Sequence, residues 1–312
     1  MTSLLVAELR VLRAEWDGVR DLCWSANTHK SRRSQWKKFF KFCQDFSLCP
    51  LPASPDTVGL YITYLTRSCC YVTIENYLSG IWALHDYWGF EHVDPTVFII
   101  RATLRGAKRL LGCESAQATP ISPSDLVKMY SVLDLSKFKD YQLWCAIILA
   151  YRCLLRVGHV TVSPHSMLVK DLHFSKEGMD VSIRSSKTIQ YKERLLVVPV
   201  VSSGSSILCP CAFLRDYIRT TGLPGTSMLF PYTYGMFSTK LKKLCSAAGL
   251  VGKFSTHSLR RGSASFLSTF LPLHDIKVYG DWKSMSVLLY LSDDYSTRKT
   301  KDVQVATRLS AF

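Results

Sequence analysis

The chain has 312 residues, of which 47% are hydrophobic and 20% are charged. This length and balance exclude a disulfide-stapled miniprotein and a disordered chain, and they favour an ordered protein of about two domains. Lys and Arg number 39 against 24 Asp and Glu, a net charge of +15. A polyanionic partner is therefore the first class of ligand to consider.

The basic residues are concentrated in two stretches that contain no acidic residue. No Asp or Glu occurs in residues 22–44, nor between Asp216 and Asp275. Solvated surfaces normally mix both signs of charge. The two stretches therefore predict two surfaces that bind nucleic acid. The candidate DNA-binding residues are Lys30, Arg33, Lys37, Lys41, Lys240, Lys243 and Arg261.

Cysteine spacing and nucleotide motifs exclude several other classes of site. The eleven cysteines form no Cys-x-x-Cys pair, so buried thiols in a reducing compartment are expected rather than disulfides or zinc. Walker A, glycine-rich dinucleotide and His-Glu-x-x-His patterns are absent, so we expect no metal and no cofactor. The most apolar run, residues 143–155, is too short for a membrane span and contains Arg152.

The first third of the chain is predicted to be helical. Apolar residues at spacings of three and four predict an amphipathic helix within residues 1–24. A second helix begins near Thr28, with one apolar face and one basic face. Its predicted apolar face comprises Trp36, Phe39, Phe40, Cys43 and Phe46.

Capping signals mark three more helices. Ser54 and Pro55 predict one helix start, and two further helices are expected to stop at Gly89 and Gly112. Residues 25–112 thus form a predicted helical domain. The small, polar, aperiodic residues 113–121 predict a linker.

The rest of the chain, residues 122–312, combines helices with short strands. A helix is expected to restart at Ser122 and Pro123, followed by an apolar helix that ends near Arg156. Alternating runs then predict a small antiparallel sheet from residues 168–174, 179–183 and 195–200. Further helices are predicted near residues 211–219, 238–248, 258–270, 273–279 and 284–291.

Several residues of this second region have side chains suited to phosphate chemistry. His257 and Arg260 are three residues apart on one helical face, where both can donate to one phosphate. Arg156 ends an apolar helix, where a charge needs an anionic partner, and an ordinary salt bridge is the alternative explanation. Lys187 lies on a predicted hairpin, where a solvated turn lysine is the alternative. Trp282 or Tyr290 alone would be explained more readily as part of a core than as a functional residue.

Taken in chain order, these residues resemble the active-site set of the tyrosine recombinases, the phage-integrase superfamily. The set is Arg156, Lys187, His257, Arg260, Trp282 and Tyr290. The resemblance implies a mainly α fold with a small antiparallel sheet. In it, a helical core-binding domain and an α+β catalytic domain form a C-shaped clamp around double-stranded DNA.

Short motifs resemble one branch of this superfamily in particular. Residues 154–158, 186–188 and 257–262 are similar to recombinases of eukaryotic mobile elements, such as DIRS-like and Ngaro retrotransposons and Cryptons. The resemblance implies integration of a mobile element, a nuclear location, and a homotetramer on DNA that can be a monomer when free. The tail after Tyr290 is then expected to dock in a neighbouring subunit.

The resemblance also implies a role for each residue. Tyr290 attacks the scissile phosphate and forms a 3′-phosphotyrosyl link, which requires neither ATP nor metal. Arg156 and Arg260 neutralise the non-bridging oxygens as bidentate forks. Lys187 protonates the leaving 5′-oxygen.

The other two residues support this chemistry. His257 donates to the phosphate or assists deprotonation of the tyrosine, and the sequence leaves both roles open. Trp282 supports the site through its indole N–H and its ring.

One position departs from the family pattern and keeps two other functions open. Members commonly carry Glu or Asp three residues after the first arginine, where this chain has His159. Either another acid braces Arg156, or that arginine is less well fixed. A catalytically weakened DNA-binding protein derived from a recombinase is therefore an alternative. A type IB topoisomerase-like strand transferase is another, because it shares the chemistry without the tetramer.

Overall fold

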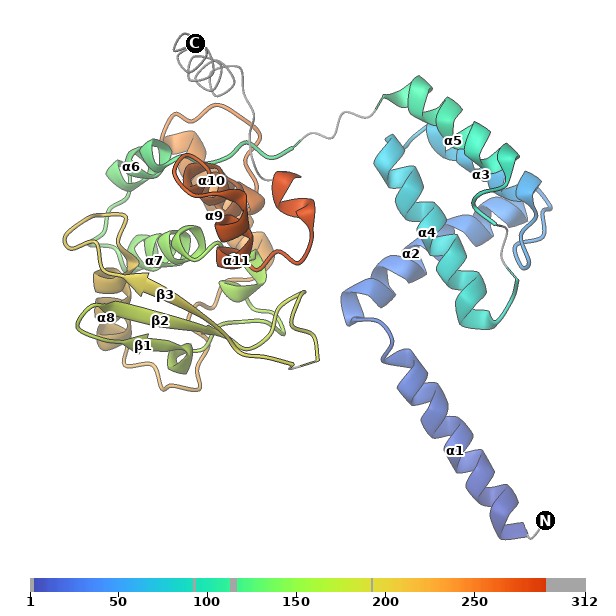
Figure 1. The fold of residues 1–312 in the computed structure, drawn as a ribbon, viewed down its shortest axis with the longest axis horizontal. Coiled ribbons are helices and arrows are strands. Elements are labelled where there is room, and N and C mark those ends of the chain that lie inside the picture. The colour runs from blue at the N-terminus through green and yellow to red at the C-terminus, as the bar shows by residue number, and fades with distance from the viewer. Residues whose placement is uncertain (1–2, 92–93, 113–116, 192, 290–312) are drawn as a thin grey trace, which may run out of the picture. The chain divides into compact units, whose positions relative to one another are not determined.

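The chain divides into two compact units, Met1–Ala116 and Gln117–Phe312. The computed structural model describes residues 3–91, 94–112, 117–191 and 193–289 (Figure 1). The first unit is all helical, and the second combines helices with one three-stranded antiparallel sheet. The predicted fold class, mainly α with a small antiparallel sheet, is confirmed.

The first unit contains five helices, and its sequence signals explain where several begin and end. The side chain of Ser54 caps one helix by accepting from the Thr57 N–H at 3.1 Å, and Pro55 occupies its first turn. Gly89 ends another helix in the left-handed region, at φ 71°. The helices are α1 (Ser3–Asp21), α2 (Ala26–Asp45), α3 (Pro55–Thr66), α4 (Tyr71–Trp88) and α5 (Phe98–Leu111).

The core of this unit is built on one face of α2. Phe39 and Phe42 are buried, and both rings lie 5.0 Å from the ring of Tyr61 on α3. The predicted apolar face is wrong at two positions, because Phe40 and Phe46 are 39% and 55% exposed. Phe40 is about 100° around the helix from Phe39, so its side chain points partly to solvent. Phe46 lies beyond the helix end, and its exposed ring still lies 6.2 Å from the ring of Tyr64 on α3.

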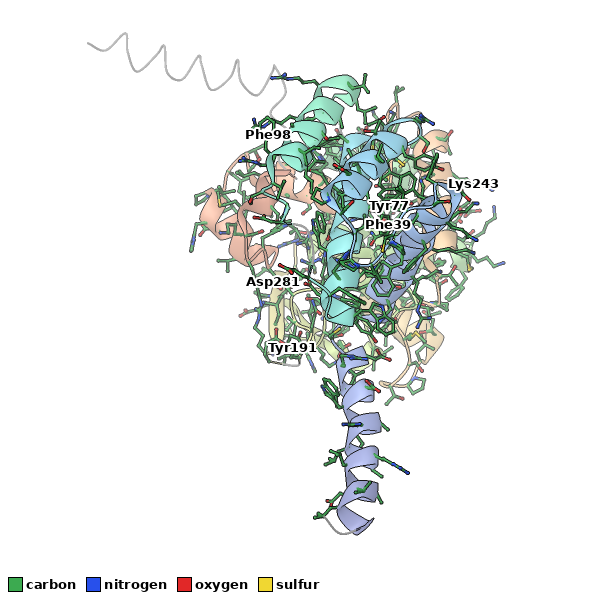
Figure 2. The ribbon with its side chains drawn as sticks, turned by 90° about the vertical axis from the view of Figure 1, so that its right-hand side faces the viewer. Phe39, Tyr77, Phe98, Tyr191, Lys243 and Asp281 are labelled. Carbon is green, nitrogen blue, oxygen red and sulfur yellow. The ribbon has the colours of Figure 1, made fainter. Side chains whose placement is uncertain are left out.

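Helix α1 forms as predicted, but its apolar stripe is not buried. It projects away from the other helices of its unit (Figures 1 and 2). Trp16 and Val19 are 62% and 66% exposed. The amphipathic pattern therefore predicted the helix but not a surface that covers it.

The second unit places helices around its sheet. Strands β1 (Leu172–Phe174), β2 (Gly178–Ile183) and β3 (Leu196–Val201) pair antiparallel in chain order. The first strand is shorter than predicted because Val169–Asp171 form a 3₁₀ turn, η2. The helical segments are α6 (Pro123–Ser131), α7 (Phe138–Arg152), η1 (Val157–His159), α8 (Pro210–Thr221), α9 (Tyr234–Ala247), α10 (His257–Leu267), α11 (Leu273–Tyr279) and η3 (Met285–Leu289).

Helix α7 forms the centre of this unit. Every residue from Gln142 to Tyr151 is buried, as expected for a helix that is apolar all round. Part of the predicted linker also belongs here, because Thr119 and Ile121 bond to the backbone of Lys253 and Ser258 at 2.9 and 3.1 Å. The side chain of Ile121 is fully buried, so residues 117–121 pack as part of the second unit. Their aperiodic composition concealed these contacts.

Two absences among the described residues bear on function. No helix among them has both the length and the apolar character needed to cross a membrane. The same residues contain no cluster of His, Cys, Asp and Glu able to hold a metal ion.

Candidate active site

Arg156 lies between the end of α7 and the start of η1. The chain leaves α7, passes through Leu154 at φ 47°, and enters η1 directly after Arg156. The half-buried guanidinium donates from Nη1 to Thr188 Oγ1 at 3.4 Å. The Thr188 hydroxyl donates in turn to a carboxylate oxygen of Asp281 at 2.6 Å. An anionic group is thus linked to Arg156 through one hydroxyl.

Arg260 is held in the second unit's interior. It lies one turn into α10 and is only 3% exposed. Its guanidinium donates to the backbone carbonyls of Leu154 and Gly280, the latter at 2.6 Å from Nη2. These carbonyls and the ring of Trp282, whose centre lies 4.0 Å away, compensate the buried charge.

Trp282 fills the space beneath this arginine. It is 7% exposed and packs with Leu154, Leu267 and Ile276 in a small apolar cluster. A Cβ at Gly280 would lie 1.7 Å from a ring carbon of Trp282. Only glycine at that position lets the ring lie where it supports the guanidinium.

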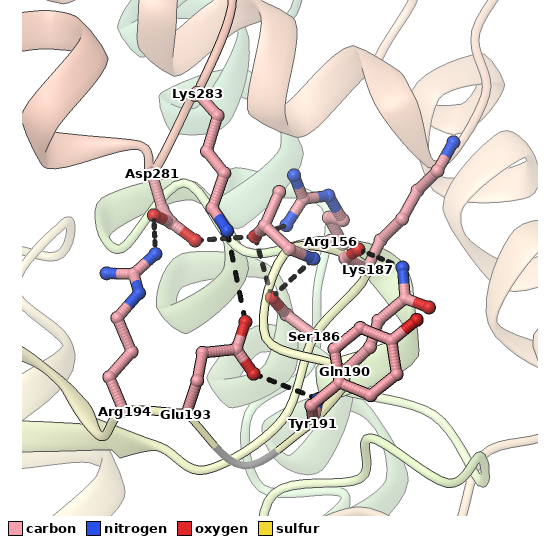
Figure 3. Close-up of polar contacts among 10 residues, drawn as sticks. Arg156, Ser186, Lys187, Gln190, Tyr191, Glu193, Arg194, Asp281 and Lys283 are labelled. Carbon is pink, nitrogen blue, oxygen red and sulfur yellow. Dashed lines mark hydrogen bonds and ion pairs between the residues drawn. The ribbon is translucent and has the colours of Figure 1, made fainter.

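Lys187 occupies a short turn between β2 and β3. Ser186 and Ile189 bridge the turn, and the carbonyl of Lys187 accepts from Gln190 Nε2 at 2.6 Å. The lysine side chain is exposed and points away from Asp281 (Figure 3). Its ammonium group is therefore accessible to a ligand.

His257 lies at the start of the helix that carries Arg260. It is the first residue of α10 and remains exposed. Desolvation and the nearby charges of Arg260, Arg156 and Lys187 all lower the pKa of His257. His257 and Arg260 are three residues apart on α10, so their side chains lie on the same side of the helix. Arg156 and Arg260 also line the same small cavity.

His159 does not carry charge in this arrangement. It is buried, and its Nε2 donates to the carbonyl of Ser185 at 3.2 Å. Burial, together with the charges of Arg156, His165 and Arg260, lowers the pKa of His159 to about 4. The neutral ring therefore bonds to the segment that leads into the Lys187 turn. The acid linked to Arg156 is Asp281 instead.

Thr188, Asp281 and Arg194 are functional candidates that the sequence did not reveal. Arg194 forms an ion pair with Asp281 (Figure 3). Partial burial raises the pKa of Asp281, but the hydrogen bond from Thr188 and the pairing with Arg194 together lower it by more. The pKa is therefore below its ordinary value, and the carboxylate is ionised at neutral pH. The acid stands between Gly280 and Trp282, and that neighbourhood was the one available signal.

The predicted DNA-binding residues differ in their accessibility. Lys30, Arg33, Lys37 and Lys41 are all exposed along α2, and Lys41 also pairs with Asp45 at 3.0 Å. In the second unit, Lys243 is exposed on α9 (Figure 2), and Lys240 and Arg261 are half-buried. The basic face of α2 is therefore open to a polyanion over most of its length.

The predicted nucleophile is not part of this geometry. Tyr290 and the tail that follows it lie outside the described residues, which end at Leu289 in η3. Helix η3, which follows Trp282, ends at the residue before the tyrosine. The role of Tyr290 therefore stays a prediction.

Comparison with known proteins gives a consistent result. No family model matches the chain. A curated relative, the integrase/recombinase XerD homolog of Selenomonas ruminantium, is 26% identical over 269 residues, covering 80% of this chain and 75% of the relative. Its name describes an integrase or recombinase.

Solved structures share the fold at lower sequence identity. The Tn1549 transposon integrase in complex with transposon right-end DNA has a TM-score of 0.64 and 13% identity, covering 91% of this chain and 95% of its own. A lambda integrase dimer bound to a COC′ core site has a TM-score of 0.61 and 16% identity, covering 91% and 96%. The chain is thus similar in sequence to an integrase/recombinase XerD homolog and shares its fold with the Tn1549 and lambda integrases.

Proposed function

We propose that this protein is a site-specific DNA recombinase that cleaves and rejoins strands through a 3′-phosphotyrosyl intermediate. The observation that carries the proposal is that Arg156 and Arg260 line one small cavity, with His257 about one helical turn before Arg260. These side chains are the charged donors that bind a backbone phosphate. The XerD homolog supports the same class of reaction.

The reaction uses each group once. The Tyr290 oxygen forms a bond to phosphorus while the bond from phosphorus to the 5′-oxygen breaks. The phenolic proton passes to neutral His257, and Lys187 gives a proton to the leaving oxygen. Arg156 and Arg260 stabilise the charge on the non-bridging oxygens. Because the phosphotyrosyl bond conserves the energy of the broken bond, the reverse attack rejoins the strand without ATP.

The basic face of α2 provides the second contact with DNA. Lys30, Arg33 and Lys37 are exposed on one helix of the first unit, where they bind phosphates rather than base edges. Phosphate contacts give affinity that falls steeply with salt. The Tn1549 and lambda integrases, which share this fold, were solved in complex with DNA, and this supports double-stranded DNA as the partner.

We also propose that the reaction integrates a mobile element in the nucleus, with four protomers assembled on DNA. The motifs at residues 154–158, 186–188 and 257–262 support this through their resemblance to recombinases of eukaryotic mobile elements. The transposon integrase among the similar folds supports integration as the reaction.

A covalent-adduct assay tests the proposal. Duplexes that bind the protein are first selected from a random pool, and a nick is then placed in the selected sequence so that cleavage cannot reverse. The wild-type protein should form a denaturation-resistant adduct with this DNA. Tyr290→Phe should bind the DNA and form none. If the wild-type protein binds the DNA but forms no adduct, the result would favour the alternative, a catalytically weakened DNA-binding protein derived from a recombinase.

A second assay separates recombination from topoisomerase-like strand transfer. Both activities form the adduct, but only recombination requires several protomers to bring two duplexes together. Sedimentation of the protein on selected DNA should show a tetramer. Relaxation of supercoiled DNA by a monomer, with no exchange of strands between duplexes, would favour the topoisomerase-like function.

A further inference from the structure

Three consecutive residues, 280–282, help to position both Arg156 and Arg260. The carbonyl of the first residue and the ring of the third hold Arg260, as described above. The side chain of the middle residue, Asp281, extends to Thr188, which accepts from Arg156 (Figure 3). Thr188 and Asp281 are 93 residues apart in sequence, so this contact fixes the β2–β3 connection to the segment that follows α11.

The hydrogen bonds at Thr188 are mutually consistent. A hydroxyl has one proton and two lone pairs. Thr188 Oγ1 gives its proton to Asp281 at 2.6 Å, which leaves the lone pairs for Arg156 Nη1 at 3.4 Å and Ser186 Oγ at 2.9 Å. Ser186 Oγ also accepts the Thr188 N–H at 3.1 Å. With its proton given to the carboxylate, the hydroxyl keeps both lone pairs available, one of them for the guanidinium.

The backbone at Asp281 favours a different residue from the one present. Its φ is 53°, in the left-handed region that suits glycine and that aspartate tolerates better than most side chains. The carboxylate is nonetheless 12% exposed and pairs with Arg194. An acidic side chain in an unfavourable backbone region at a candidate active site points to a functional use.

We propose that Asp281, acting through Thr188, is a positioning residue that fixes the Arg156 guanidinium for strand cleavage. The inference rests on the proposed recombinase function and identifies the acid that braces this arginine. His159, three residues after Arg156, is neutral and bonds to Ser185 instead. The charge of Asp281 reaches Arg156 across one hydroxyl, in a chain of hydrogen bonds that polarise one another.

A double-mutant cycle on nicked, selected DNA tests the relay. Asp281→Asn keeps the size and backbone preference but removes the charge, and Thr188→Val removes the hydroxyl. Each should slow single-turnover adduct formation at saturating DNA by about tenfold or more, with the Kd for DNA changed less than about twofold. The double variant should be no slower than the slower single variant, because both cut one chain of contacts.

Two further variants separate positioning from general packing. Asp281→Gly suits the positive φ, so it folds without strain and should be as slow as Asp281→Asn. Glu193→Gln weakens the neighbouring Lys283–Glu193 ion pair, 3.9 Å long, and should retain the wild-type rate. Thermal unfolding of each variant confirms that the fold is retained.

Different outcomes would overturn the positioning role of Asp281 and the proposed recombinase function. Wild-type rates in Asp281→Asn and Asp281→Gly, multiplicative losses in the double variant, or an equal loss in Glu193→Gln would each show that Asp281 does not act through Thr188 on Arg156. Failure of the wild-type protein to form any adduct would overturn the recombinase function instead.

Discussion

The guanidinium carbon of Arg260 lies 4.0 Å from the centre of the Trp282 ring. The ring, with the carbonyls of Leu154 and Gly280, fixes the arginine plane before any ligand arrives. A pre-oriented donor costs no reorganisation when charge develops on a phosphate. The tryptophan therefore contacts the arginine directly and supports its orientation.

Gly280→Ala should disrupt this stack. The added Cβ would lie 1.7 Å from a Trp282 ring carbon, so the ring or the loop must move. We expect a loss of about 1–3 kcal/mol in the free energy of unfolding, and adduct formation slowed by at least about tenfold. Chemical denaturation and the nicked-DNA assay measure the two effects.

Gly235→Ala is the matched control for that substitution. It lies in α9, and nothing comes within 4 Å of its added Cβ. Alanine there should leave adduct formation unchanged and increase stability by up to about 1 kcal/mol. An unchanged cleavage rate in Gly280→Ala would show that the stack is dispensable.

Arg260→Lys should separate cleavage from binding. A lysine keeps the charge but cannot lie flat over the ring and donate to two carbonyls as the planar guanidinium does. Adduct formation should fall by about a hundredfold, the scale for losing one pre-oriented donor. The Kd for DNA, measured by fluorescence anisotropy, should change little. A large loss of affinity would assign Arg260 to docking.

Lys37 and Lys38 are neighbours in sequence with different predicted roles. Lys37 is exposed on the basic face of α2. Lys38 instead lies over the ring of Tyr77, 4.8 Å from its centre, and contacts Cys69. Lys37→Ala should reduce the slope of log K against log salt by about 0.9, the value for one phosphate contact. Lys38→Ala should leave that slope unchanged, and equal slopes for both variants would contradict the proposed surface.

The stability of the second unit should fall in acid partly because of His159. Its folded pKa of about 4 lies below the ordinary value of 6.5, so the unfolded chain binds more protons between these pH values. The contribution is complete above pH 6.5 and is lost as the pH falls toward 4. It amounts to about 3 kcal/mol at most.

His159→Gln isolates this contribution, since the amide can still donate to Ser185 but does not titrate. Urea unfolding at several pH values should show a shallower acid loss in the variant than in the wild type. His165 and His257, whose pKa values are also lowered, titrate in both proteins and cancel in the comparison. Identical pH profiles would show that His159 is not buried neutral.

Much of the fold could be predicted because its signals are local. Ser122 and Pro123 begin α6 with a capping box, and Gly89 ends α4 in the left-handed region. What could not be predicted depends on distant partners. The burial of Phe42 in place of Phe40 depends on where α3 lies, and the amphipathic pattern of α1 did not reveal its exposure.

The site shows the same division. Residue types and order indicated Arg156, Lys187, His257 and Arg260, because phosphate chemistry requires strong donors. The link from Arg156 to Asp281 depends on a contact between segments far apart in sequence, and no local pattern marks it. Likewise, His159 was a departure from a family pattern, and only its neighbours show which group it bonds.

The most direct test of the central claim is the identity of the residue that joins the DNA. The adduct formed on nicked, selected DNA is digested with a protease and a nuclease, and the nucleotide-bearing peptide is sequenced by mass spectrometry. The phosphodiester link is expected on the Tyr290 oxygen, at the 3′ end of the cleaved strand. A link to Tyr295 or to any other residue, or a 5′ attachment, would contradict the account.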